Sequence, residues 1–443
     1  MNNIEDIKKK ANYCESCITK PCQTGCPLYN DITDFIKMIK EEKYEEGYKI
    51  LSKTTFLESV CGRICPHQKQ CQGMCVKGVS YEPVNIGDLE TFIGDLSIKN
   101  NWTIDVPDET KYKVAVIGSG PSSLTCAAFL RKNGIGVTIY EKYDYLGGLL
   151  VHGIPDFRLP KDIVKDTVDK IINLGIDVKY NCKFGEDITL EQLQKEHDAV
   201  FIGIGANVSN KMNVLGEELK NVYGANEILE YKLDINFVNK IVVICGGGDV
   251  AMDIARFVKR KNAKKVIITY RRSEDEMPAD KKEIEEAKNE GIEFLLQTNI
   301  LKITGDKKVS GINLIKTKLV KKEGELRLSP VNIEGSEYNL ECDYVISAIG
   351  ASTDKNLLDK LNLKLNSKNQ IMIDTKGHTS IEKVYAGGDV TGAKSTVSWA
   401  ARSGRNAALE IINKLKGEEW IDVNGVMIKI NYMLNIMMKN GEY

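Results

Sequence analysis

The chain has 443 residues, 42% of them hydrophobic and 28% charged, which suits several buried cores in about two to four domains. Lys and Arg number 61 against 62 Asp and Glu, so neither nucleic acid nor an anionic membrane is an expected partner. No apolar run reaches the roughly 18 residues of a membrane span, and residues 1–10 are polar and Lys-rich. We therefore expect a cytoplasmic protein, in which clustered cysteines indicate metal or redox sites rather than disulfides.

Residues 1–110 favour helices and contain eight of the twelve cysteines. The apolar spacing within residues 32–50 predicts a helix there, and a second helix is expected over residues 87–98. Residues 102–111, with Pro107 and several acidic side chains, are typical of a linker.

Short apolar strands alternate with helices from Lys113 onward, and the same rhythm begins again at Lys240. We expect strands over 114–117, 137–140, 241–245 and 265–270, with helices over 122–133 and 250–259. One βαβ nucleotide-binding unit used twice predicts an α/β fold, with parallel sheets covered by helices on both faces.

A dinucleotide fingerprint follows the first of these strands. Gly118 permits a tight turn, Gly120 lets the backbone approach a pyrophosphate at the helix N-terminus, and Ser123 is small enough for close helix packing. Glu141 ends the next strand, where an acid hydrogen-bonds ribose hydroxyls. Strand, helix, second strand and acid stand in the required order, so an empty glycine turn is the weaker interpretation.

A second glycine loop, with Gly246, Gly248, Asp249 and Val250, opens the helix of the restarted unit. The strand that follows ends in Arg271 and Arg272 instead of an acid. Arginines at this position can bind a 2′-phosphate, which favours NADP(H) over NAD(H), although most arginines are only surface charges.

Two fingerprints predict two dinucleotides, and the usual pair is FAD with a pyridine nucleotide. The segment from Val384 to Thr391 supports FAD, because its Gly388 and Asp389 end a strand and can place a carboxylate on the ribityl chain.

The cysteines of residues 1–110 fall into two closely spaced groups. Cys14, Cys17, Cys22 and Cys26 form the first, and Cys65, Cys71 and Cys75 form the second. Such spacing favours [4Fe–4S] clusters, and a Cys-Pro pair such as Cys26-Pro27 can ligate the neighbouring cluster. Zinc is the alternative, but its sites usually contain two CxxC pairs.

Together these motifs resemble the glutamate synthase small-subunit family of iron–sulfur flavoproteins, from about Asn12 to Leu415. That family also covers the N-terminal half of dihydropyrimidine dehydrogenase and the large subunits of NADH-dependent ferredoxin:NADP oxidoreductase and of sulfide dehydrogenase. The residues from Gly147 to Pro160 and from Tyr270 to Pro278 share in the resemblance. The five residues between Cys65 and Cys71 resemble the dihydropyrimidine dehydrogenase and ferredoxin:NADP oxidoreductase branch.

The resemblance implies two [4Fe–4S] clusters. One would be held by Cys14, Cys17, Cys22 and Cys75, and the other by Cys26, Cys65, Cys71 and Glu90. Eight cysteines alone would suggest four ligands for each cluster, so Cys61 remains the alternative to Glu90. Without the resemblance, the sequence alone would favour a solvated helix glutamate at Glu90.

The resemblance also implies that the NADP domain is inserted in the FAD domain. The expected parts are an iron–sulfur domain at 1–110, FAD-binding parts at 111–206 and 342–443, the latter with a C-terminal tail, and an NAD(P)H-binding domain at 207–341. Further expected FAD contacts are Pro121, Gly148, Leu149, Arg158 and Val397. Gly350 is expected on the nicotinamide side.

The expected function is hydride transfer from NADPH to FAD, followed by electron flow through both clusters to a partner. That partner would be an acceptor subunit or a ferredoxin-like protein at the iron–sulfur domain, in a homo- or hetero-oligomer. No catalytic acid or base is assigned, and His67 is interpreted as structural. An electron-bifurcating large subunit, a stand-alone enzyme like sulfide dehydrogenase, and a non-catalytic relay or scaffold remain as alternatives.

Overall fold

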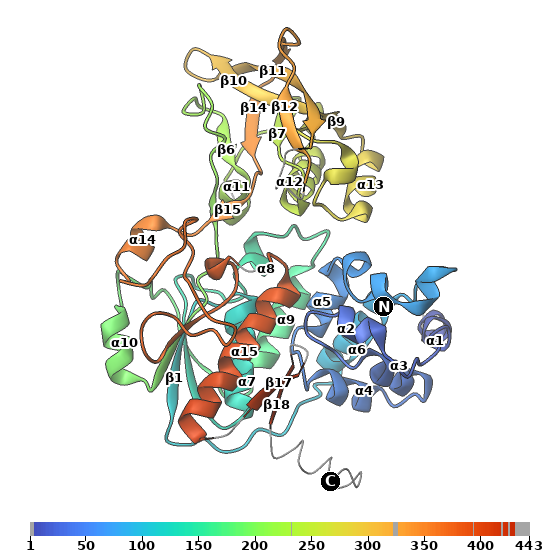
Figure 1. The fold of residues 1–443 in the computed structure, drawn as a ribbon, viewed down its shortest axis with the longest axis vertical. Helices are drawn as coiled ribbons and strands as arrows, with labels where there is room; N and C mark the ends of the chain where they lie inside the picture. Colours follow the sequence, from blue (N-terminus) through green and yellow to red (C-terminus); the bar gives the residue numbers. More distant parts are fainter. Residues whose placement is uncertain are drawn as a thin grey trace. The chain divides into compact units, whose positions relative to one another are not determined.

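A computed structural model describes residues 4–231, 233–321, 327–392, 394–417, 420–423 and 426–429 (Figure 1). The chain divides into two compact units. The first contains Met1–Val151, Asp156–Gly205 and Thr353–Tyr443, and the second contains His152–Pro155 and Ala206–Ser352. None of the described helices combines the length and the apolar character that crossing a bilayer requires.

The first unit begins with a helical region built around one apolar core. Its α-helices are α1 (Ile4–Asn12), α2 (Pro21–Gly25), α3 (Ile32–Lys40), α4 (Tyr44–Leu51), α5 (Glu58–Ile64) and α6 (Ile86–Lys99). Short 3₁₀ turns lie between α5 and α6, namely η1 (His67–Lys69), η2 (Gln72–Met74) and η3 (Val76–Val79). Phe35, Ile36 and Tyr48 are among the side chains buried in this core.

The prediction of one helix over residues 32–50 is wrong. The structure has two helices, and the backbone between them turns at Glu42, whose φ is 58°. The break allows α3 and α4 to bury Phe35 and Tyr48 in the same core. An apolar pattern that continues across the break cannot reveal this reversal.

A five-stranded parallel sheet forms the second part of the first unit. Its order is β16 (Val384–Ala386), β4 (Ala199–Ile202), β1 (Lys113–Ile117), β2 (Gly136–Tyr140) and β3 (Asp177–Lys179). The helices of this part are α7 (Pro121–Lys132), α8 (Leu149–His152), α9 (Lys161–Ile172), α10 (Leu190–Glu196), α14 (Lys355–Asp359) and α15 (Val397–Lys416). Helices α7 and α15 pack closely, because a Cβ at Gly404 would collide with the Ser122 carbonyl oxygen.

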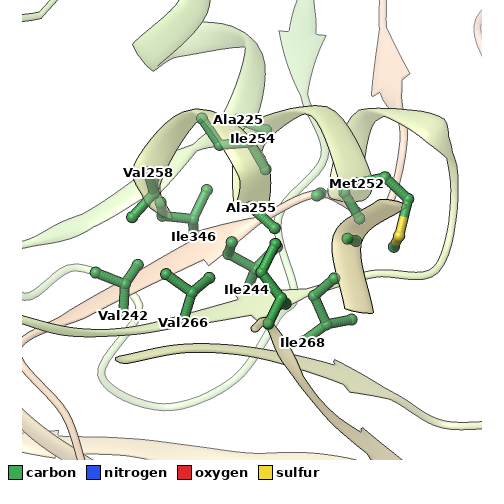
Figure 2. Packing of buried hydrophobic residues seen from close by; sticks show 14 of the residues in the cluster. Ala225, Val242, Ile244, Met252, Ile254, Ala255, Val258, Val266, Ile268 and Ile346 are labelled. Carbon is green, nitrogen blue, oxygen red and sulfur yellow. The ribbon is translucent and has the colours of Figure 1, made fainter. Parts of the chain in front are cut away.

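The second unit contains its own five-stranded parallel sheet. Its order is β6 (Val222–Gly224), β14 (Tyr344–Ser347), β7 (Ile241–Cys245), β8 (Lys265–Tyr270) and β9 (Glu293–Leu296). Helices α11 (Ala225–Tyr231), α12 (Asp249–Arg260) and α13 (Lys281–Asn289) belong to the same unit. Figure 2 shows α12 placing Ile254, Ala255 and Val258 against strand residues such as Val242 and Ile346.

The remaining strands of the second unit are antiparallel. Strands β10 (Thr298–Gly305), β11 (Val309–Val320), β12 (Ser329–Asn332) and β13 (Tyr338–Glu341) pair through β11. Strand β5 (Val208–Ser209) pairs with β15 (Ala351–Ser352). A separate hairpin joins β17 (Trp420–Val423) to β18 (Val426–Lys429).

The expected fold class is confirmed: a helical N-terminal region precedes two Rossmann-like parts, and the second is inserted in the first. The expected end of the inserted part, at residue 341, falls before β14. That strand pairs with β6 and β7 of the second sheet, so the second unit continues to Ser352. The expected C-terminal tail lies largely outside the described residues.

Candidate functional site

The first glycine loop joins β1 to α7 in a tight turn. Gly118 has a φ of 83°, and a Cβ there would lie 2.8 Å from the carbonyl oxygen of Gly203. Gly120 caps the helix, and among the described residues none other than its two chain neighbours has an atom within 4 Å of where its Cβ would be. Pro121 occupies the first helical position, where its missing N–H is not needed. The helix N-terminus therefore faces open space, which suits a phosphate group.

Glu141 follows β2 and is tied to the glycine loop through Ser119. The Ser119 hydroxyl donates to Glu141 Oε2 at 2.6 Å, and the Tyr143 N–H donates to Oε1 at 3.0 Å. Burial raises the pKa of Glu141, and these two hydrogen bonds oppose that shift. The carboxylate oxygens keep lone pairs that can accept further hydrogen bonds, for example from a ribose hydroxyl. Sequence patterns missed Ser119, because it stands at a variable position of the fingerprint.

Two other predicted FAD residues pack against the same loop. The Ser123 hydroxyl lies 3.3 Å from the carbonyl oxygens of Ile117 and Gly203 and fastens α7 to the sheet. Gly148 approaches the loop from a different segment, because a Cβ there would lie 3.1 Å from Gly120 Cα. Leu149 then begins α8.

The end of β16 meets the same edge of the sheet. The Gly388 N–H donates to the Ser403 hydroxyl at 2.8 Å, and that hydroxyl lies 3.2 Å from the hydroxyl of Ser122. Asp389 follows Gly388, and burial raises the pKa of its carboxyl group. The structure thus brings Gly120, Glu141 and Asp389 to the carboxyl edge of one parallel sheet, where α/β proteins bind dinucleotides.

Two predicted FAD residues lie further along the first unit. Val397 is the first residue of α15. Arg158 is partly buried in the segment that joins α8 to α9. Ser122 and Ser403 were missed by sequence analysis, because no local pattern links serines so far apart in the chain.

The second glycine loop joins β7 to α12 in the second unit. Gly246 has a φ of 153°, and a Cβ there would collide with the Ala348 carbonyl oxygen. Gly248 caps α12, and Asp249 Oδ1 accepts a hydrogen bond from the Asp280 N–H at 2.9 Å. Val250 is 38% exposed at the start of the helix.

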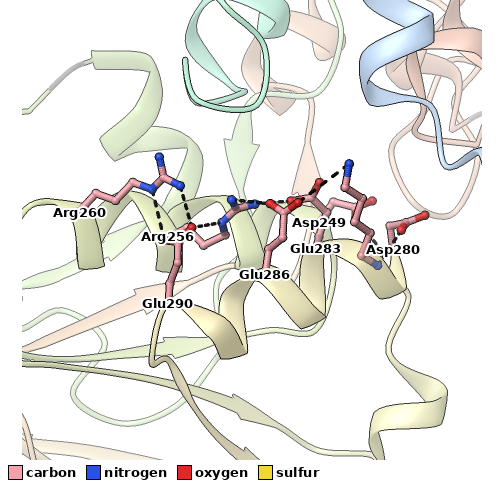
Figure 3. A network of polar contacts seen from close by, with 8 residues as sticks. Asp249, Arg256, Arg260, Asp280, Glu283, Glu286 and Glu290 are labelled. Carbon is pink, nitrogen blue, oxygen red and sulfur yellow. Dashed lines mark hydrogen bonds and ion pairs between the residues drawn. The ribbon is translucent and has the colours of Figure 1, made fainter. Parts of the chain in front are cut away.

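An ion-pair network anchors the helix of the second loop (Figure 3). Arg256 of α12 contacts three carboxylates, those of Glu283 and Glu286 in α13 at 2.6 Å and that of Glu290, which caps α13, at 2.9 Å. The Arg256 side chain is buried, so these contacts satisfy its charge. The network fixes α12 against α13 through Arg256.

The structure separates the two predicted 2′-phosphate ligands. Arg271 is exposed, and its charge acts on Cys245 at the end of β7. Arg272 is instead largely buried, with Nε 3.0 Å from the Leu328 carbonyl oxygen and 3.9 Å from Glu276 Oε2. Gly350 is exposed, and its carbonyl oxygen accepts from the Asn210 N–H at 2.9 Å.

The first cysteine set is assembled in one cavity. Cys14, Cys17, Cys22 and Cys75 line it together with apolar side chains that include Ile32. Burial, together with the nearby thiols of Cys14 and Cys75, raises the pKa of Cys22 to about 11. An apolar cavity bordered by four thiols fits a cluster that binds thiolates, whose charge the iron would neutralise.

The second set also comes together, with both candidates for its fourth ligand. Burial raises the pKa of Cys26 to about 12, and the charges of Glu90 and Cys65 add to this effect. Cys71 interacts electrostatically with Cys26, Glu90 and Cys65. Cys61 is buried and interacts electrostatically with Cys65 and Cys26.

Glu90 is 5% exposed, so the interpretation of a solvated helix glutamate does not hold. Its Oε1 accepts a hydrogen bond from Asn30 Nδ2 at 3.1 Å, and Asn30 Oδ1 accepts one from the Thr54 hydroxyl at 2.7 Å. Burial raises the pKa of Glu90 well above its ordinary value, and the charge of Cys65 adds to this. A buried carboxylate among thiols has the chemistry of a metal ligand.

His67 borders the second set. Its Nδ1 lies 3.5 Å from Cys71 Sγ, and its Nε2 lies 3.1 Å from the carbonyl oxygen of Gly62. Within the described part of the chain, no three His, Cys, Asp or Glu side chains are arranged to hold a single metal ion.

Comparison with known proteins finds a matching family model for each of two parts of the chain. Residues 112–404 match the family model of pyridine nucleotide-disulphide oxidoreductases, and residues 1–102 match that of dihydropyrimidine dehydrogenase domain II, 4Fe-4S cluster. Mycobacterium tuberculosis FprA in complex with NADPH shares the fold, with a TM-score of 0.62 and 19% identity over 70% of this chain and 85% of that one. Thioredoxin reductase of T. acidophilum does so with a TM-score of 0.54 and 22% identity over 69% of this chain and 100% of that one.

Fold and motifs thus define a pyridine nucleotide–dependent flavin oxidoreductase with an iron–sulfur domain. The small chain of NADPH glutamate synthase from Escherichia coli (strain K12) is 33% identical over 92% of this chain and 91% of its own length. The same protein of Azospirillum brasilense is 34% identical over 91% of this chain and 88% of its own length. The beta subunit of NADP(+)-dependent formate dehydrogenase from Moorella thermoacetica is 34% identical over 90% of this chain and 60% of its own length.

The chain belongs to the glutamate synthase small-chain family of iron–sulfur flavoproteins, as the motifs predicted. It is an NAD(P)H-dependent FAD oxidoreductase with a [4Fe–4S] domain.

Proposed function

We propose that this chain is the NADPH-oxidising subunit of a larger enzyme, and that its electrons leave through two [4Fe–4S] clusters to a partner protein. Relatives named as a small chain and as a beta subunit support the role of a subunit. Bound FAD would supply the conversion between a two-electron hydride donor and one-electron acceptors.

One observation carries the proposal: within the first unit, the second cysteine set touches the FAD-binding part. Gln70, which directly precedes Cys71, lies within hydrogen-bond distance of the hydroxyl of Ser398, the second residue of α15, at 3.2 Å from Nε2 and 3.3 Å from Oε1. The same helix carries Ser403, which holds Gly388 beside Asp389. The FAD site and a cluster site therefore share one structural element.

The residues of the dinucleotide sites would bind and orient their ligands. Gly120 leaves room for a pyrophosphate, and the acceptors Glu141 and Asp389 would hold the sugar hydroxyls of FAD. Arg271 would bind the 2′-phosphate of NADPH, and Arg272 would support the loop from its buried position.

Exposed apolar side chains beside the first cysteine set support a partner surface. Ile18 follows Cys17 and is 98% exposed, while Val79 and Tyr81, shortly after Cys75, are 84% and 74% exposed. Large apolar side chains that stay exposed close in sequence to proposed cluster ligands would suit a protein–protein contact.

The proposal is tested by anaerobic titration of the purified protein with NADPH. We expect the flavin band near about 450 nm to bleach and the broad iron–sulfur absorbance to fall afterwards. NADH should bleach the flavin less readily at equal concentration. Iron-free protein, or a flavin band that NADPH does not change, would contradict the proposal.

A further inference from the structure

Helix α3 presents one side to the cavity that the first cysteine set lines. Ile32, Thr33 and Ile36 of this helix border the cavity together with the four cysteines. Lys40 ends the helix one turn after Ile36, and residues four apart lie on the same face of a helix. Two polar side chains, those of Thr33 and Lys40, therefore belong to the side of α3 that faces the first cysteine set.

The ammonium group of Lys40 is fixed beside Cys14. Its Nζ donates to the Cys14 carbonyl oxygen at 2.6 Å and lies 3.3 Å from the Ser16 hydroxyl. The Lys40 side chain is half-buried, and Glu15, the acid that directly follows Cys14, is paired with Lys77 instead. The Lys40 charge is thus held next to a proposed iron ligand by neutral partners.

Thr33 lies in the first turn of the same helix. The residue is 4% exposed, and its hydroxyl oxygen has no hydrogen-bond partner among the described residues. A buried hydroxyl without a partner is unfavourable, so such a group calls for an acceptor. Because Thr33 borders the cavity of four thiols, the sulfur atoms of a bound cluster are acceptors of the kind that this hydroxyl lacks.

A positive charge and a hydroxyl donor both stabilise negative charge nearby. A cluster gains an electron on reduction, so groups of this kind favour its reduced form and raise its reduction potential. The two side chains act differently: the Lys40 charge acts through space from the Cys14 backbone, whereas the Thr33 hydroxyl would contact the cluster itself.

We propose that Thr33 and Lys40 raise the reduction potential of the cluster that the first cysteine set holds. Thr33 donates a hydrogen bond to a cluster sulfur, and Lys40 is a positioning residue that places its charge beside Cys14. This inference rests on the first ligand set of the proposed function. It makes α3 the element that sets how readily the first cluster accepts an electron.

The test is a redox titration of the full-length holoprotein, followed by EPR, for the wild type, T33V and K40Q. In each variant we expect the cluster signal that C22S removes to be reduced about tenfold less readily, which is about 59 mV for one electron. T33S keeps the hydroxyl and K40R the charge, and both should retain the wild-type potential. K37Q removes an exposed lysine of the same helix, one that does not border the cavity, and should leave both cluster potentials unchanged.

Ionic strength separates the Lys40 charge from a structural effect of its contact with Cys14. The difference between wild type and K40Q should shrink when salt is raised from about 0.05 M to about 0.5 M, because salt screens a half-buried charge. The difference between wild type and T33V should stay the same. A K40Q shift that salt does not reduce would overturn the role of the charge.

An unchanged potential of the first cluster in iron-replete T33V or K40Q would overturn the inference, and so would equal shifts in K40Q and K40R. If one of the two variants does not retain iron, the other decides: a shift of the first signal supports the inference, and no shift overturns it. Failure of the proposed function is distinguishable, since it would appear as missing iron or missing cluster signals in the wild type.

Discussion

Arg405 of α15 donates a hydrogen bond from Nη1 to the carbonyl oxygen of Leu28 at 2.8 Å. The same nitrogen donates to the Thr54 carbonyl oxygen at 2.9 Å, and the side chain is only 2% exposed. Leu28 directly follows Cys26 and Pro27, so a guanidinium near the end of the chain fixes the loop of a proposed cluster ligand.

Replacing Arg405 by methionine should destabilise the protein through this loop. Two carbonyl groups lose a charged donor, and we expect the free energy of unfolding to fall by about 3 kcal/mol. Chemical denaturation of the holoprotein measures the change. R402A, one turn earlier, removes only a partly exposed contact with Trp399 and should cost about 0.5–1 kcal/mol. Equal losses in the two variants would contradict a special role for Arg405.

Single substitutions in the two cysteine sets should remove different clusters. C22S affects the first set and C71S the second, and each should leave about half of the wild-type iron. Iron analysis and EPR of anaerobically purified protein will show which signal each variant loses. C182S lies outside both sets and should retain all iron. Loss of the same signal in C22S and C71S would refute two separate sites.

The fourth ligand of the second cluster can be decided between Glu90 and Cys61. We expect E90A to alter or abolish the EPR signal of that cluster, because its only carboxylate ligand is removed. C61A should keep both signals, since the family resemblance assigns the fourth ligand position to Glu90 and not to Cys61. The reverse pattern would assign the cluster four cysteines.

The two arginines after β8 should differ in their effect on coenzyme choice. R271A should lower kcat/KM for NADPH about 10- to 100-fold and change that for NADH little, because a charged contact to the 2′-phosphate is lost. R272A should mainly lower stability, since its guanidinium is engaged with the Leu328 carbonyl oxygen. Steady-state kinetics with both coenzymes, beside thermal unfolding, separate these effects. Equal losses with NADPH and NADH in R271A would argue against a phosphate ligand.

Asp389 should make the stability of the flavin-free protein depend on pH. Burial raises the pKa of its carboxyl group above 3.8, so the folded state holds its proton more tightly than the unfolded state does. The resulting stabilisation of the folded state is fully present below the ordinary pKa, and it is lost as pH rises through the raised pKa. Thermal unfolding from about pH 4 to about pH 7 should show the decline, and D389N should lack it.

The same D389N variant should bind FAD more weakly. An amide is a poorer acceptor for sugar hydroxyls than a carboxylate, and we expect an affinity loss of about 10-fold or more. Fluorescence titration of the flavin-free variant measures it. Unchanged affinity would show that Asp389 does not contact FAD.

Local patterns predicted the framework of both sheets. Strands β7 and β8 have the predicted bounds, because short β-branched runs between glycine and polar residues specify buried parallel strands. The break at Glu42 was not predictable, since it depends on how α3 and α4 share one core. The family motifs also selected Glu90, for which helix periodicity alone predicted a solvated glutamate.

The contacts that complete the sites escaped prediction. Ser119 contacts Glu141, Ser403 contacts Gly388, and Ser398 contacts Gln70 beside Cys71. Serine has no strong preference that identifies its partner, and such pairs form only when segments distant in sequence fold together. Residue type and spacing therefore predicted the candidate binding residues, but only the structure revealed the side chains that orient them.

Helix α15 contacts the loops that carry the cysteines, and these contacts limit which fragments of the protein can be studied separately. A fragment confined to residues 1–110 would keep every proposed iron ligand but lose Ser398 and Arg405. Its second centre would be left open to water and oxygen on the side that α15 covers. Transplanting the electron-carrying module into another flavoenzyme would thus require grafting α15 with it.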